Sequence, residues 1–279
     1  MKDRGIVLID YINRIKDFHG FNSYDFLELI FGIIPSECVD KSLVRRVSSF
    51  YNIKFCSISK RSCYVHGRIH GYIVMALCAL LLSNCWREFC ETVCVEDRLS
   101  TVTATLLAGI LHDSWIFRYH HSPFIWLTEG LISSKIAKDL FRNIVDRGNS
   151  REDIFKRVIS AIKRHPGPVK RRMPATLEGL VLSEADVLSQ FTLPFNLLRL
   201  NSYEKGIISR IVTFVNKKSI SNWFYNREKG LKLPPKILIP SRLRNFATAV
   251  FSQSLNIFNE FKQKTPPILL NHLYSRYGS

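Results

Sequence analysis

Histidines at the ends of apolar segments are the residues of this chain best placed to do chemistry. The chain has eight histidines, and five of them fall in two clusters: His66 and His70, and His112, His120 and His121. Asp113 directly follows His112, and Asp186 lies in a later apolar segment. Imidazole nitrogens and carboxylate oxygens bind divalent ions that act on phosphates, with coordination positions left for water and a phosphate oxygen. A histidine from one helix, the His-Asp pair from a second and an aspartate from a third would supply such a set.

The segments that carry these residues have the pattern of buried helices. The segment 66–84 is very apolar after His70, and 101–111 is similar, which is typical of helices buried on most sides. Elsewhere apolar residues recur at spacings of three and four with few alternating runs, so we expect an all-α fold. Further helices are expected at 6–18, 23–34 (capped by Asn22 or Ser23), 41–51, 125–145, 150–164, 177–190, 202–215 and 242–261. The prolines around 237–239 predict a linker or a packed loop there.

Ordered motifs accompany the histidines along the chain. YVHGRIH at 64–70 opens one apolar helix, LLAGILHD at 106–113 closes another, and EADVL at 184–188 lies on a third. This set resembles the HD superfamily of metal-dependent phosphohydrolases. GLISSKIAKDLF at 130–141 and VISAIKRH at 158–165 are similar to the two helices that follow the His-Asp doublet in that family. TLEGLVLSEADVL at 176–188 is similar to its closing motif, TLEAxxxxDADxLD, so the resemblance covers about residues 64–190.

The resemblance implies a fold and a set of metal ligands. We expect an HD-domain helical bundle at 61–195, an N-terminal helical segment at 1–60 that packs on it, and a basic helical C-terminal region at 196–279. The metal ligands would be His70, His112, Asp113 and Asp186. The cofactor would be a divalent metal (Mn, Mg, Fe, Ni or Zn), with one ion preferred over two. Asp113 could bridge if a second ion binds, and the metal-bound water would be the nucleophile.

Residues near the motifs are candidates for supporting roles. The stretch after Asp113 lacks the acidic group that some family members use as general acid or base, and an imidazole could shuttle protons instead. Besides Asp113, the catalytic candidates are His120, His121, Glu178 and Glu184. Candidate accessory metal ligands are His66, which would share a helix face with His70, Glu129 and His165. Candidate contacts for substrate phosphate are Arg68, Lys163 and Arg164. Each of these could equally be a hydrogen-bonded or surface residue outside the chemistry.

The charge of the chain favours anionic partners. Forty Lys and Arg against 23 Asp and Glu give a net charge of +17. Residues 191–279 hold 14 of the basic and three of the acidic residues, so this part alone carries +11. Aromatic and basic residues alternate in WFYNR at 223–227, a mixture that suits stacking on bases and contact with phosphates. The region is therefore a candidate for binding nucleic acid, although a packed helix with a solvated basic face explains the same residues.

Several other classes of protein fit the sequence poorly. The longest apolar run, 72–82, is shorter than the roughly 18 residues of a membrane span, so no membrane span is expected. The N-terminus carries charges where a signal peptide is apolar, which favours a cytoplasmic protein. The seven cysteines include no C-x-x-C pair, so neither a zinc ribbon nor a disulfide framework is indicated.

Three functions remain as hypotheses at this point. The first is a metal-dependent phosphohydrolase that acts on a nucleotide or another phosphate ester. The second is an HD nuclease on single-stranded nucleic acid, guided to the strand by the basic C-terminal region. The third is a degenerate HD domain that binds nucleic acid or a nucleotide without catalysis, for which the missing acidic residue after Asp113 is the motive.

Overall fold

Helices make up the regular structure of this chain wherever the structure describes it. The computed structural model describes residues 2–15, 21–56, 68–119, 129–144, 151–164, 176–192, 194 and 241–264. These ranges form about ten helices and no strand, which confirms the expected all-α class. The α-helices are α1 (Lys2–Arg14), α2 (Ser23–Ile33), α3 (Lys41–Cys56), α4 (Arg68–Asn84), α5 (Trp86–Thr92), α6 (Val95–Leu111), α7 (Ile116–Tyr119), α8 (Glu129–Ile144), α9 (Arg151–Arg164), α10 (Leu177–Ser189) and α13 (Arg244–Lys264). Two short 3₁₀ turns, η1 (Ser36–Cys38) and η3 (Ser241–Leu243), accompany them.

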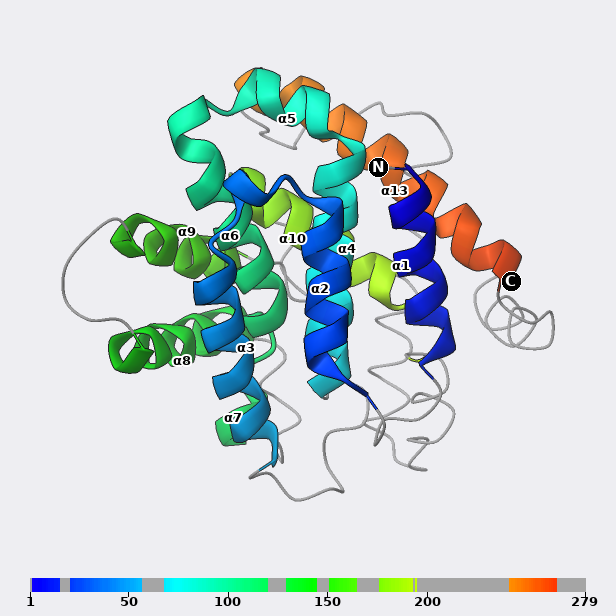
Figure 1. Ribbon diagram of the computed structural model, residues 1–279. Helices are drawn as coiled ribbons and strands as arrows, with labels where there is room; N and C mark the ends of the chain where they lie inside the picture. The colour runs from blue at the N-terminus through cyan, green and yellow to red at the C-terminus, as the bar shows by residue number, and fades with distance from the viewer. Residues whose placement is uncertain are drawn as a thin grey trace, which may run out of the picture.

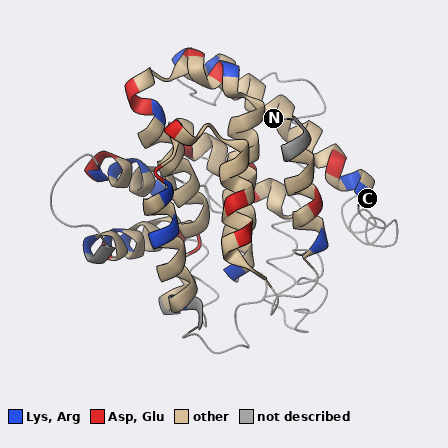
Figure 2. Ribbon diagram, in the orientation of Figure 1, with Lys and Arg blue, Asp and Glu red and all other residues tan. Residues whose placement is uncertain are grey.

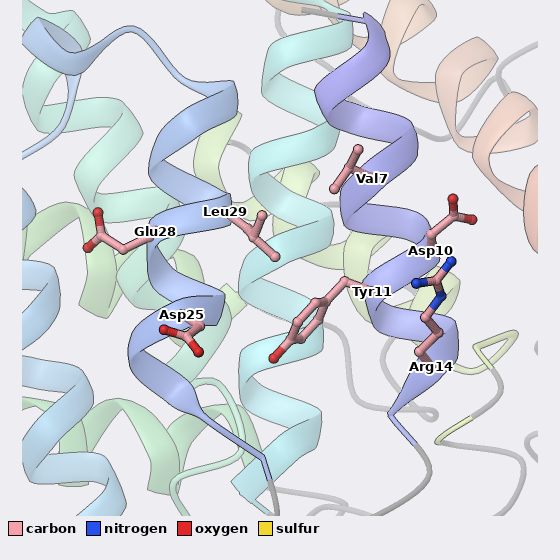
Figure 3. Close-up of a pocket in the computed structure, with 7 residues that line it drawn as sticks. All are labelled: Val7, Asp10, Tyr11, Arg14, Asp25, Glu28 and Leu29. Carbon is pink, nitrogen blue, oxygen red and sulfur yellow. The ribbon is translucent and has the colours of Figure 1, made fainter.

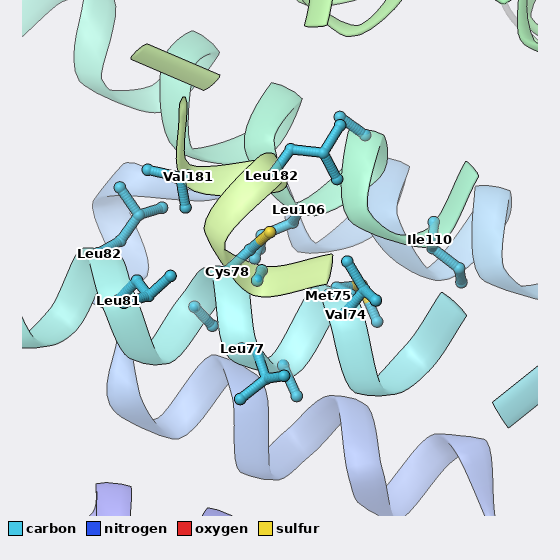
Figure 4. Packing of buried hydrophobic residues seen from close by; sticks show 14 of the residues in the cluster. Val74, Met75, Leu77, Cys78, Leu81, Leu82, Leu106, Ile110, Val181 and Leu182 are labelled. Atoms are coloured by element: carbon cyan, nitrogen blue, oxygen red, sulfur yellow. The ribbon is translucent and has the colours of Figure 1, made fainter. Parts of the chain in front are cut away.

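Helices α4 and α6 lie at the centre of the fold, and α10 packs against both (Figure 1). In α4 every residue from Ile69 to Leu82 is buried, and in α6 the same holds from Thr101 to Leu111. Figure 4 shows apolar side chains of the three helices packed together, among them Leu77, Leu106 and Val181. The expectation that these two segments are buried on most sides is confirmed.

The remaining helices surround this centre. Helices α1 to α3 cover one side, α9 packs against α6 and α8 packs against α9 (Figure 1). Helix α13 contacts α1, α4, α5 and α10. Leu8 of α1, Phe26 of α2 and Phe251 of α13 belong to the same hydrophobic cluster as α4 and α6. The described parts of the chain therefore share one core. The boundaries expected near residues 60 and 195 adjoin segments outside the described residues and stay predictions.

Several helix boundaries differ from the sequence expectation. Helix α6 begins at Val95 rather than at 101, because its first turns are polar and partly exposed and so lack the apolar pattern that marks its interior. The short helix α5 was not expected, and α1 begins at Lys2 and ends at Arg14. The N-cap of α2 is Asn22, whose side chain accepts hydrogen bonds from the backbone N–H groups of Tyr24 and Asp25. The helix expected at 202–215 and the segment 237–239 lie outside the described residues.

The described surface carries basic side chains on two neighbouring helices. Figure 2 shows Lys and Arg on α8 and α9, while most of the +11 region at 191–279 lies outside the described residues.

The described cysteines form no disulfide: Cys38, Cys78, Cys85, Cys90 and Cys94 are free thiols. No single described helix is long and apolar enough to cross a membrane; α4 and α5 pass that test only as a pair, and they meet at a bend of 80°.

Candidate metal centre

A close crossing of α4 and α6 brings the two central histidines together. A Cβ atom on Gly109 would lie 2.8 Å from Cα of Met75 in α4, and one on Gly71 would lie 2.8 Å from the carbonyl oxygen of Ile110 in α6. Both neighbours are backbone atoms, so glycine allows the two helices to approach where a side chain would hold them apart. His70 adjoins one of these glycines, and His112 follows the other by three residues. The crossing therefore sets the distance between the two imidazoles.

Four side chains from this crossing and from α10 lie close together around the two histidine nitrogens, and we call them the His-Asp cluster. Its members are His70, His112, Asp113 and Asp186. The two histidine Nε2 atoms are 3.2 Å apart. Oδ2 of Asp113 lies 3.2 Å from Nε2 of His70 and 3.4 Å from Nε2 of His112. Oδ1 of Asp186 lies 3.3 and 3.4 Å from the same two nitrogens.

These separations fit ligands of a single divalent ion. Ligand atoms about 2.1 Å from an ion are about 3.0 Å apart at the corners of an octahedron and about 3.4 Å apart in a tetrahedron. The distance between the two histidine nitrogens and the four distances from these nitrogens to the carboxylate oxygens lie between these limits. The buried group of His70, His112 and Asp113 could therefore bind a metal ion, with Asp186 beside it.

The hydrogen bonds behind the two imidazoles turn their lone pairs toward the cluster. Nδ1 of His112 lies 2.7 Å from the carbonyl oxygen of Gly109, which can only accept, so Nδ1 carries the proton. The Ser189 hydroxyl donates to the carbonyl of Asp186 at 2.7 Å and lies 3.5 Å from Nδ1 of His70, from which it can accept. Two lone pairs on nitrogen and two carboxylate oxygens thus face one another. Only a positive charge, a metal ion or a proton, makes such an arrangement favourable.

The pKa shifts of the two histidines follow from the same contacts. Burial disfavours the charged form of His70, but the carboxylates of Asp113 and Asp186 outweigh it, so the pKa of His70 is raised. Burial also opposes the charge on His112, and the same two carboxylates raise the pKa of His112 well above its ordinary value. Protons therefore compete with a metal ion for the two histidine nitrogens.

Asp113 is held from its far side. Oδ1, the oxygen that faces away from the histidine pair, accepts a hydrogen bond of 3.2 Å from the indole Nε1 of Trp115. The turn that carries both residues is tied to α8, because the backbone N–H of Trp115 donates to Oγ of Ser133 at 3.0 Å. Oγ of Ser114 donates to the carbonyl of Ser133 at 3.2 Å. Helix α8 therefore fixes the orientation of a metal-ligand candidate that it does not itself carry.

Glu129, at the start of α8, is a third buried acidic residue of this region. Glu129 is buried, with 9% of its surface exposed. Burial raises its pKa well above the ordinary value, and the charges of Asp113 and Asp186 raise it further. A cation nearby would offset these charges and favour the ionised carboxylate, as the expected role of an accessory ligand requires.

The other candidates from the sequence lie in different surroundings. Glu178 is about 12 Å along α10 from Asp186, by the helical rise, and accepts a hydrogen bond of 3.2 Å from Arg157. Glu184 is buried on α10, two residues before Asp186, so the two side chains leave the helix on different sides. Arg68 donates to the carbonyl oxygen of Phe21 at 3.1 Å and stacks over its ring.

The remaining candidates cannot be placed as contacts of the site. Lys163 is exposed on the last turn of α9. The candidates that lie outside the described residues are His66, His120, His121, His165 and the side chain of Arg164.

Two cavities elsewhere do not include the His-Asp cluster. A groove of about 600 Å³ between α1 and α2 is lined by Val7, Asp10, Tyr11, Arg14, Asp25, Glu28 and Leu29 (Figure 3). Its carboxylates have partners: Asp10 pairs with Lys264, and Glu28 pairs with Arg45. A second cavity, of about 400 Å³, lies around Arg157 and Glu178. Neither has a metal-ligand candidate in its lining.

The structure adds residues that the sequence reasoning did not single out. Gly71 and Gly109 are ordinary small residues of apolar helices in the sequence, and only the crossing reveals their role. Trp115 stands two positions after Asp113, and from the sequence alone an aromatic residue there would be interpreted as part of the core. Its hydrogen bond to Asp113 is seen only in the structure. Arg157 contacts three carboxylates, those of Asp97, Asp153 and Glu178, although its i,i+4 spacing from Asp153 was a visible signal for only one of them.

No protein-family model, no curated protein and no solved structure matches this chain.

Proposed function

We propose that this chain is a metal-dependent phosphohydrolase that acts on a nucleotide or another phosphate ester through an HD-type site. The observation that carries the proposal is the buried group of His70, His112 and Asp113, whose donor atoms lie 3.2–3.4 Å apart. An oxygen of Asp186 from α10 lies 3.3 and 3.4 Å from the two histidine nitrogens. Two nitrogen and two oxygen donors suit Mn, Fe, Ni, Zn or Mg. We prefer one ion, because the donor separations of His70, His112 and Asp113 match a single coordination shell.

The exposure of the cluster suggests where a substrate would approach. The side chains of His70, His112 and Asp113 are 2%, 1% and 6% exposed, whereas that of Asp186 is 21% exposed. The His-Asp cluster therefore opens on the side of Asp186. A divalent ion held there would lower the pKa of a bound water toward neutrality and polarise a phosphoryl oxygen.

The chain's own residues would contribute binding and orientation. The two histidines present lone pairs, because their Nδ1 atoms face Gly109 and Ser189. Asp113 is oriented by Trp115, and Glu129 supplies a further carboxyl group within the same electrostatic environment. Arg68 lies two residues before His70, and its guanidinium has further N–H groups beyond the one that bonds Phe21, which keeps it a candidate for phosphate contact.

A nuclease is the second candidate within the same chemistry. The feature that favours it is the +11 charge of residues 191–279, since a polyanionic strand gains from many basic contacts while a mononucleotide needs few. The absence of an acidic residue at 114–117, directly after Asp113, is the motive for a third candidate, a domain that binds nucleotide or nucleic acid without turnover.

The test is metal content followed by hydrolysis. The full chain, purified without chelator and reconstituted with each candidate ion, is expected to hold about one ion, and Asp113→Ala is expected to lose it because one of four donors is gone. Asp139→Ala, on the surface of α8, is the matched control and is expected to keep the ion. No bound ion in the wild type after reconstitution, or full occupancy in Asp113→Ala, refutes the proposal.

Hydrolysis assays then separate the candidates. Phosphate or pyrophosphate release from mononucleotides supports the phosphohydrolase. Cleavage of single-stranded DNA or RNA supports the nuclease. Metal binding with no turnover of either, together with steeply salt-dependent binding of a single strand, supports the non-catalytic alternative.

A further inference from the structure

The hydrogen bond from Trp115 to Asp113 has a geometry that bears directly on metal binding. Oδ2 of Asp113 faces both histidine nitrogens at 3.2 and 3.4 Å, while Oδ1 accepts from the indole Nε1 at 3.2 Å. The two oxygens of one carboxylate are thereby assigned different tasks. One faces the place where an ion would lie, and the other is anchored to the protein.

The anchor is itself held in place. Backbone hydrogen bonds close the turn after α6, from Ser114 N to Leu111 O at 3.0 Å and from Ile116 N to Asp113 O at 3.1 Å. Ser133 of α8 accepts from the backbone N–H of Trp115 at 3.0 Å. Trp115 is half-buried and packs against the hydrophobic core. The indole is therefore fixed by packing and by backbone bonds before any ion is present.

An indole N–H is well suited to this task. It donates one hydrogen bond, accepts none and keeps its proton at all accessible pH values, so it neutralises part of the charge on Oδ1 without competing for the metal. A donor on one oxygen also disfavours a carboxylate that binds an ion through both oxygens or bridges two ions.

We infer that Trp115 is a positioning residue, which holds Asp113 ready to bind one ion through Oδ2 alone. The inference rests on the proposed metal site and extends it to a residue outside the ligand set. Groups that orient metal ligands in this way typically contribute about 10- to 100-fold in metal affinity. Trp115 acts through Asp113, and its indole N–H rather than its ring surface is the active part.

The experiment measures Mn²⁺ and Zn²⁺ affinity by calorimetry on the full-length chain. Trp115→Phe, which removes the N–H and keeps an aromatic ring, is expected to bind about 10- to 100-fold more weakly than the wild type. Because the smaller ring leaves a void, a second variant carries 3-benzothienylalanine at position 115, which keeps the indole shape and replaces N–H by sulfur. It is expected to show the same loss of affinity with an unchanged melting temperature in chelator.

Trp86→Phe is the matched control, since Trp86 is a half-buried tryptophan of α5 that stacks on Phe89 and lacks contact with the His-Asp cluster. Its metal affinity is expected to equal that of the wild type. Wild-type affinity in the benzothienylalanine variant overturns the inference, because the ring and not the N–H would then matter. A wild type that binds neither ion overturns the proposed metal site and this inference together, so the two failures are distinguishable.

Discussion

Substitution of Gly109 by alanine tests whether the crossing of α4 and α6 sets the geometry of the metal site. The new Cβ would lie 2.8 Å from Cα and 3.0 Å from the backbone nitrogen of Met75. Neither atom belongs to a flexible side chain, so the helices themselves must move. Ordinary contact at 3.4 Å requires a separation of about 0.6 Å, a strain typical of overpacked sites.

The effect on stability and the effect on metal binding are expected to differ. Overpacking costs about 1–3 kcal/mol, while replacing a helical glycine by alanine returns about 1 kcal/mol, so the free energy of unfolding falls by at most about 2 kcal/mol. The same movement would widen the Nε2–Nε2 distance from 3.2 Å to about 3.8 Å, beyond the edge of about 3.4 Å that a tetrahedral ion allows. Metal affinity should then fall at least about tenfold, which corresponds to about 1.4 kcal/mol.

The assay is calorimetric titration of metal into Gly109→Ala, combined with chemical denaturation in chelator. Gly5→Ala is the control, because its Cβ would meet only the end of the Leu80 side chain at 3.0 Å, which can rotate away. That variant should keep its metal affinity and lose no stability, since the helical Gly→Ala replacement itself is favourable. If Gly109→Ala binds metal as tightly as the wild type, the close approach of α4 and α6 does not determine the site and the reasoning is wrong.

Two further predictions concern pH and a remote ion pair. In chelator, the free energy of unfolding should fall as the pH rises, because the folded protein holds protons on Glu129, His70 and His112 more tightly than the unfolded chain does. The fall due to Glu129 should begin at about pH 4.5, and the fall due to the two histidines at about pH 6.5. Saturating metal should remove the part due to the histidines, and denaturation at several pH values measures both; stability that rises with pH in chelator contradicts this. Arg157→Met should cost about 1–3 kcal/mol, because it leaves the buried carboxylate of Glu178 without its cation. Bound metal, measured on the same variant, should stay at the wild-type level, and its loss would link the ion pair to the site.

The parts of the fold that could be predicted are those with a strong local signal. The long apolar runs of α4 and α6 mark helices that are buried on most sides, and their interiors lie where the sequence predicted them. Asn22 caps α2 as its type and position indicate. Helix α5 was missed because seven residues with mixed polarity give no clear period.

Some residues of the candidate site could be predicted from the sequence, and others could be found only from the structure. His70, His112, Asp113 and Asp186 could be proposed together because their residue types and motif order are visible in the sequence. The function of Gly109 depends on which helix crosses it, and no local pattern encodes that contact. The hydrogen bond of Trp115 depends on a rotamer within a turn, although the residue stands only two positions from Asp113.

The energetics of the His-Asp cluster agree with a group that could bind a metal ion. His70 and His112 are buried among apolar residues of α4 and α6, where leucine side chains of similar volume would pack without any desolvation cost. The cluster brings four hydrogen-bond acceptors together, so without a cation each carboxylate lies opposite a lone pair unless the imidazoles take up protons. Trp115 and Ser189 add hydrogen bonds that orient these groups, and the indole N–H offsets only part of the charge on Asp113. A bound cation would restore the favourable balance without protonation of the imidazoles, which is the energetic arrangement expected of a metal-binding site.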